Sequence, residues 1–67
     1  MNYDLFKQLI ENSPVSISYI CEQIGLKRPT FYFQLKNKTL SVDNFLKIAK
    51  IINLSKDEIM KILQLNN

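Results

Sequence analysis

The side chains that most often perform chemistry in proteins are scarce in this sequence. It contains no histidine and a single cysteine, Cys21. Activating a nucleophile with a general base, or a water with zinc, needs several groups of these types, so neither arrangement can be assembled. Cys21 falls at an apolar position of an expected helix, where a small residue suits close packing better than reaction. We therefore expect no enzymatic activity, no metal and no cofactor.

Cationic side chains gather in one part of the chain. The protein carries nine Lys and Arg against six Asp and Glu, a net charge of +3. Residues 23–42 include no acidic residue, and their four cations are Lys27, Arg28, Lys36 and Lys38. The remaining five cations and six acids sum to −1. A segment of one sign is typical of a surface that faces a polyanion, and a merely solvated cationic face is the alternative.

Length and composition indicate the class of protein. Sixty-seven residues suffice for one domain, so we assign residues 1–67 to a single domain. The N-terminus has no basic segment before an apolar run, and no apolar stretch approaches the roughly 18 residues of a membrane span. Together with the lone cysteine, this predicts a cytoplasmic protein that has no membrane partner.

Apolar residues recur at spacings of three and four between the chain breakers, which indicates an all-α fold of five helices. Gly25, the only glycine, suits the left-handed residue that ends a helix. The expected inward stripes are Leu5, Phe6, Leu9 and Ile10, then Ile17, Ile20, Cys21 and Ile24, then Phe31 and Leu35, then Phe45, Leu46, Ile48, Ala49 and Ile52, and finally Ile59, Met60, Ile62 and Leu63.

Three of the helix starts share one device. A serine side chain accepts hydrogen bonds from the first free backbone N–H groups of the helix, and an apolar residue before it pairs with one five positions later. The serines are Ser16, Ser41 and Ser55, and the apolar pairs are Val15 with Ile20, Leu40 with Phe45, and Leu54 with Ile59. Ser55 and Glu58 also have the spacing of a capping box.

The most specific pattern surrounds Gly25. Cys21, a small residue, stands four positions before the glycine. Ile24, Leu26 and Phe31 stand one before it, one after it and six after it. This register resembles the helix-turn-helix of the Cro and phage-repressor family, also called the XRE family.

The resemblance covers about residues 5–63, because residues 36–41 and 44–55 are similar to the family's loop, fourth helix and start of the fifth helix. It implies a compact five-helix bundle of the lambda-repressor-like DNA-binding type, with the helix-turn-helix at about residues 17–36. It also implies a regulator of phage or mobile-element type that acts in the cytoplasm of a bacterial or phage-infected host cell.

The sequence departs from the family pattern at three positions. The family usually has an apolar residue where this chain has Gln34, so we expect Phe31 and Leu35 to dock the third helix. Asn37 stands where a loop glycine is common, and asparagine tolerates the same left-handed conformation. Ile17 stands where relatives often have a polar residue that touches the DNA backbone, so that contact is expected to be missing.

The resemblance assigns the third helix, about residues 28–36, to the major groove of duplex DNA. With Phe31 and Leu35 inside, a period of about 100° per residue turns Phe33 outward. Arg28 is then the candidate for bidentate reading of a guanine and Phe33 for contact with a thymine methyl, while Pro29 offers only shape. The expected base-reading residues are Arg28, Pro29, Tyr32 and Phe33, and the expected phosphate contacts are Lys27, Thr30, Lys36, Asn37 and Lys38.

Each of these assignments has an alternative. Tyr32 and Phe33 also suit a protein interface, and Lys36 and Lys38 also suit plain solvation. Thr30 suits local packing or capping as well as a DNA contact.

The sequence thus predicts a sequence-specific transcriptional regulator that binds double-stranded DNA as a homodimer and takes no small-molecule ligand. The fifth helix is apolar over more of its circumference than a core-facing stripe of about 100° requires. Met60, Leu63 and Leu65 are therefore the expected dimer residues. The alternative function is a protein-binding adaptor or antitoxin-like module with the exposed aromatics as its partner surface.

Overall fold

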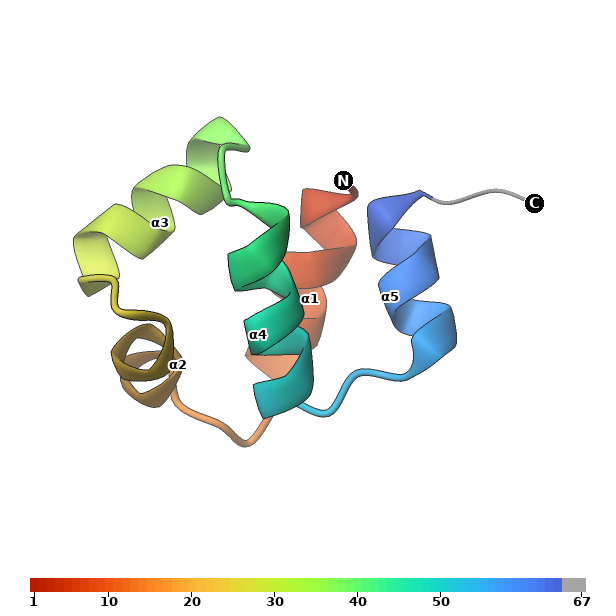
Figure 1. The fold of residues 1–67 in the computed structure, drawn as a ribbon, viewed down its shortest axis with the longest axis horizontal. Coiled ribbons are helices and arrows are strands. Elements are labelled where there is room, and N and C mark those ends of the chain that lie inside the picture. Colours follow the sequence, from red (N-terminus) through yellow and green to blue (C-terminus); the bar gives the residue numbers. More distant parts are fainter. Residues whose placement is uncertain (65–67) are drawn as a thin grey trace.

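Five α-helices make up the computed structural model of the chain, which describes residues 1–64 (Figure 1). They are α1 (Tyr3–Asn12), α2 (Ile17–Ile24), α3 (Arg28–Asn37), α4 (Val42–Ile51) and α5 (Lys56–Leu63). These 64 residues contain no strand, which confirms the all-α prediction. None of their helices has the length and apolar character that crossing a membrane requires. Leu65, one of the expected dimer residues, lies outside the described residues.

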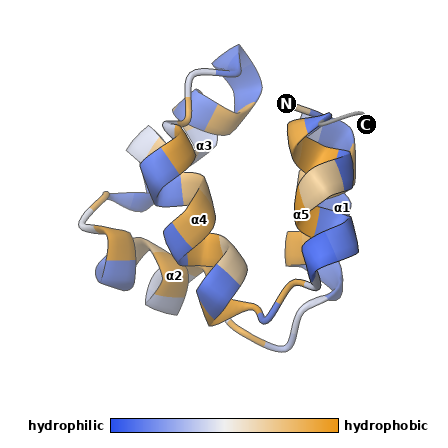
Figure 2. Ribbon diagram, turned by 45° about the vertical axis from the view of Figure 1, so that its right-hand side comes forward, coloured by the Kyte–Doolittle hydropathy of each residue, from blue (hydrophilic) through white to orange (hydrophobic). Residues whose placement is uncertain are grey.

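The helices form two groups (Figures 1 and 2). Helix α2 packs against both α3 and α4, while α1 packs against α5. The backbone N–H of Asn2 donates to the carbonyl of Ile62, which holds the start of α1 against α5. The two groups meet where the rings of Phe6 and Phe45 lie edge to face with centroids 5.0 Å apart. Both rings are completely buried, so one core serves all five helices.

Of the residues in the expected inward stripes, only Leu46 is exposed, and the others are buried or half-buried. Tyr3 joins the core although no stripe included it, and its hydroxyl donates to the carbonyl of Leu40 at 3.4 Å. Leu46 was expected to face inward and instead remains 44% exposed, because α4 buries Phe45, Ile48 and Ala49 and turns Leu46 away from them.

The helix starts follow the predicted device. Ser16, Ser41 and Ser55 each accept a hydrogen bond of 3.1 Å from the backbone N–H three residues later. The side chain of Glu58 in turn accepts from the backbone N–H of Ser55 at 2.8 Å, which completes the capping box. Asn2 caps α1 in the same way, although the sequence analysis did not single it out. Local side-chain chemistry therefore determines where these helices begin.

Helices α2 and α3 each end at a residue with left-handed backbone conformation. Gly25 ends α2 with φ +73°, as predicted. After α3 the left-handed residue is Lys38, with φ 58°, rather than Asn37. Asn37 stays in the last turn of α3, where its side-chain amide donates to the carbonyl of Phe33 at 2.9 Å. That bond favours the helical conformation for Asn37 and moves the turn one residue onward.

We expect Gly25→Ala to destabilise the fold by about 1 kcal/mol, because alanine rarely adopts a positive φ. A Cβ at this position would meet no heavy atom within 4 Å, so the cost comes from the backbone alone. Gly25→Asn is the matched control and should cost less, since asparagine tolerates this conformation. Urea unfolding followed by circular dichroism measures both. Equal losses for the two variants would contradict a purely conformational role.

Candidate nucleic-acid interface

The corner between α2 and α3 positions the segment that the sequence analysis selected. The backbone N–H of Leu26 donates to the carbonyl of Cys21 at 3.0 Å, which closes the end of α2 around Gly25. Lys27 is extended and α3 begins at Arg28. Pro29 fits the first turn of α3 because no backbone N–H is needed there.

Only one face of α3 is used for folding. Phe31 is completely buried and Leu35 is 5% exposed, which confirms that this pair docks the helix. Tyr32 and Phe33 are exposed by 52% and 63%. The other predicted site residues are also exposed: Lys27, Arg28, Pro29, Thr30, Lys36, Asn37 and Lys38. All nine predicted contacts are therefore accessible to a partner.

The exposed residues of α3 divide into two flanks. At about 100° per residue, Arg28, Tyr32 and Lys36 form one stripe, and Phe33 lies beside it, opposite the core. Thr30 and Asn37 fall on the other flank. Because the Asn37 amide also bonds to the carbonyl of Phe33, this side chain is less free for phosphate than Lys36.

Arg28 is held at the start of its stripe by α2. Its Nη1 donates to Oγ of Ser18 at 3.4 Å, across the corner between the two helices. The bond is long and exposed, so it directs the guanidinium more than it stabilises the fold. The remaining N–H groups of Arg28 stay available for a bidentate partner. Ser18 was not predicted from the sequence, since only the folded corner brings it near Arg28.

A groove of about 650 Å³ runs beside this stripe, between α3 and the end of α1. Tyr32 and Lys36 line it from α3, and Lys7 and Glu11 line it from α1. Lys7 thus adds a cation next to the predicted site, while Glu11 partly offsets it. Ile17 is half-buried in the same groove and offers no polar contact, as expected. No local signal marks Lys7, because α1 lies far from α3 in the sequence.

Cys21 lies beneath this surface and is 3% exposed. Burial raises the pKa of its thiol above the ordinary value, and the positive charge of Arg28 partly opposes that shift. The thiol therefore stays protonated at neutral pH, in agreement with a packing role. Among residues 1–64, no three potential His, Cys, Asp or Glu ligands lie close enough together to hold a metal ion.

No protein-family model matches the chain, and neither a curated protein nor a solved structure is significantly similar to it.

The pKa of Cys21 reports the position of the Arg28 charge. We expect Arg28→Ala to raise this pKa further, because a charge that favours the thiolate is lost. The midpoint of the pH profile for alkylation by iodoacetamide should move upward, whereas a change in access would alter the plateau rate instead. Lys36→Ala is the control and should leave the midpoint unchanged. Equal midpoints for wild type and Arg28→Ala would place the guanidinium away from the thiol.

Proposed function

We propose that this protein is a sequence-specific transcriptional regulator that binds double-stranded DNA through α3. The observation that carries the proposal is the exposed face of α3, where Arg28, Tyr32, Phe33 and Lys36 follow one another on a helix that lies at the outside of the molecule (Figure 1). An α-helix fits the major groove of B-DNA, and the side chains on its outward face read the base edges there.

The distribution of charge supports a polyanion as the partner. No acidic residue occurs in residues 23–42, which include all of α3. Lys36 and Lys38 lie at the end of α3 and Lys27 lies at its start, so cations flank the base-reading residues on both sides. Phosphate contacts fix the position of a protein on the duplex, and cations on both sides of the base-reading residues suit that role.

The resemblance to the XRE family supports the same reading. Three residues that carry it are compatible with a helix-turn-helix: Cys21 and Phe31 are buried, and Gly25 is left-handed. We accordingly propose the lambda-repressor-like arrangement, with α3 as the recognition helix and two copies bound to a two-fold symmetric site.

A second candidate function is a protein-binding adaptor or antitoxin-like module. It is favoured by Phe33, whose ring is 63% exposed, and by Tyr32 beside it. Aromatic side chains are enriched in protein interfaces relative to the rest of the surface. Such a partner would leave binding to random duplex DNA weak at every salt concentration, which separates the two functions.

Salt dependence tests the DNA-binding proposal. If each subunit neutralises about three phosphates, a dimer should show a slope near −5 in a plot of log affinity against log salt concentration. The measurement is a fluorescence-anisotropy titration on random duplex at several salt concentrations. The lysines and Arg28 supply the charge, so affinity should fall steeply as salt rises. An affinity that is unchanged between low and moderate salt would refute DNA binding by this protein.

Two substitutions on α3 should separate base reading from phosphate binding. Arg28→Ala should cost about 1–3 kcal/mol on the preferred site and much less on random duplex, because a guanidinium fork can read a guanine edge. Lys36→Ala should weaken both DNAs by similar factors and make the salt slope shallower by about one unit. Selection of bound sequences from a random pool provides the preferred site.

Both side chains are exposed, so both variants should keep the wild-type circular dichroism spectrum. Equal losses on specific and random DNA for Arg28→Ala would make Arg28 a backbone contact. Base reading would then fall to Tyr32, Phe33 or the shape of the DNA.

A further inference from the structure

The groove between α1 and α3 is bounded by the protein chain at both ends. Residues of the segment 13–16, which joins α1 to α2, line one end. At the other end the hydroxyl of Tyr3 donates to the carbonyl of Leu40, which ties the start of α1 to the segment after α3. The volume of about 650 Å³ falls within the roughly 300–1,000 Å³ that is typical of small-molecule sites. The groove therefore suits a ligand of limited length.

Two lysines line the groove toward the end that Tyr3 closes. Lys7 stands one helical turn after Tyr3 on α1. Lys36 stands four residues before Leu40, near the end of α3. Because Tyr3 bonds to Leu40, the two lysines line this end from opposite walls. Among the described residues that line the groove, only Glu11 is acidic, and it lies one turn further along α1, toward the opposite end.

Apolar side chains line the groove between its two ends. Ile10 and Leu35 are almost completely buried, with 4% and 5% of their surface exposed. Val15 and Ile17 are half-buried and leave apolar surface in contact with water. A ligand with an acidic head and an apolar chain matches this order, because the head meets the lysines and the chain covers the apolar surface.

We propose that this groove binds a free single-chain carboxylate of medium length, such as octanoate. The carboxylate accepts hydrogen bonds from Lys7 and Lys36, and the chain lies over Ile17. The sequence predicted no small-molecule ligand, and no local pattern marks this groove, because α1 and α3 are far apart in the sequence. One consequence rests on the proposed function. Tyr32 and Lys36 are also predicted DNA contacts, so the bound ligand should compete with DNA.

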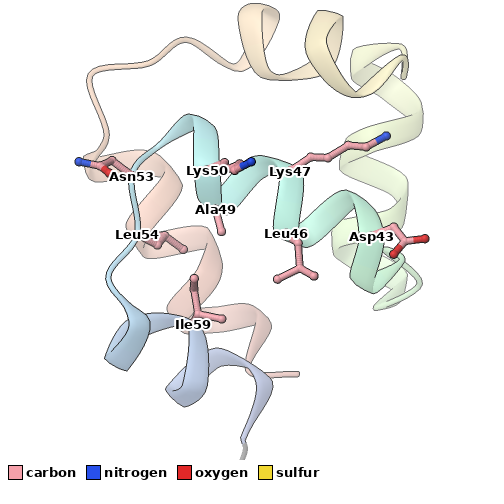
Figure 3. A pocket seen from close by; sticks show the side chains of 8 residues that line it. All are labelled: Asp43, Leu46, Lys47, Ala49, Lys50, Asn53, Leu54 and Ile59. Carbon is pink, nitrogen blue, oxygen red and sulfur yellow. The ribbon is translucent and has the colours of Figure 1, made fainter.

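A second groove lies between α4 and α5 and lacks this arrangement (Figure 3). Its volume is about 610 Å³, and Leu46 and Ile59 are among its apolar lining residues. Of the described residues that line it, the charged ones all come from α4, and they are Asp43, Lys47 and Lys50. Figure 3 shows the side chain of Lys47 pointing away from Leu46 and Ile59. Cations therefore do not converge from two walls as they do between α1 and α3.

The test is a titration of the full chain with octanoate, followed by NMR of the backbone amides. The amide signals of Ser16, Ile17 and Tyr32 should shift together and saturate, while the signal of Leu46 in the second groove should stay in place. Acetate has the same head group without the chain, and octylamine has the same chain with a positive charge. Each should bind at least about tenfold more weakly than octanoate.

Four substitutions test the placement of the head and the chain. Lys7→Gln removes one charged donor and should weaken octanoate binding at least about threefold. Ile17→Thr shortens an apolar side chain and should weaken it by a similar factor. Glu11→Gln should bind at least as tightly as wild type, because a like charge is lost. Lys47→Gln is the matched control in the second groove and should bind like wild type. Circular dichroism and urea unfolding verify that each variant is folded.

Competition with DNA is measured separately, by fluorescence anisotropy on labelled random duplex at constant ionic strength. At a concentration that saturates the groove, octanoate should raise the dissociation constant for duplex at least about threefold. Acetate at the same concentration should leave that constant unchanged. A chain that binds octanoate but no duplex at any salt concentration would refute the proposed function and support the ligand site, so the two proposals can fail separately.

Several outcomes would overturn the ligand site. Octanoate could leave the amide signals unchanged, or acetate could shift them as strongly. Lys7→Gln could bind octanoate as tightly as wild type, or Lys47→Gln alone could lose binding. Binding to anionic lipid vesicles without a response to free octanoate would make the ligand a membrane surface instead. Octanoate that fills the groove without releasing bound duplex would refute the competition.

Discussion

The contact between Phe6 and Phe45 joins the two halves of this small fold. Helices α1 and α5 pack on each other, and α2 packs on α3 and α4, so each group alone would expose an apolar face. The edge-to-face rings, 5.0 Å apart, bring these faces together into one core. A chain of 67 residues is too short to bury two separate hydrophobic cores. The position of every helix therefore depends on the core that all five share.

Helix α3 gives few side chains to that core, which leaves most of its surface for the proposed partner. Of its ten residues only Phe31 and Leu35 are buried. The corner at Gly25 and the packing on α2 hold the helix in place, so its other side chains are not needed to stabilise the fold. Two large aromatic side chains, Tyr32 and Phe33, remain on the surface at a cost in exposed apolar area. A binding partner that covers Tyr32 and Phe33 would remove this exposed apolar area from water.

Two grooves remain at the outside of this fold, and they use different elements. One lies between α3 and the adjacent end of α1, where Lys7 and Lys36 outnumber Glu11. The other lies between α4 and α5, where Asp43, Lys47 and Lys50 accompany the apolar side chains of Leu46 and Ile59.

The sequence by itself determined what depends on neighbouring residues. Serine caps act over three residues, the left-handed Gly25 acts at one position, and Phe31 and Leu35 follow from a helical period, so all of these were predictable. Only the tertiary structure decided what depends on distant residues. It buried Tyr3 against Leu40, 37 positions away, brought Lys7 beside Tyr32 and Lys36, and exposed Leu46 in a groove that needs α5 as its other wall. The left-handed turn at Lys38 instead of Asn37 is a local difference, since the Asn37 amide bonds to the carbonyl of Phe33 only four residues earlier. Periodicity reports which face of a helix is apolar, but the neighbours that cover that face are set by how five helices share one core.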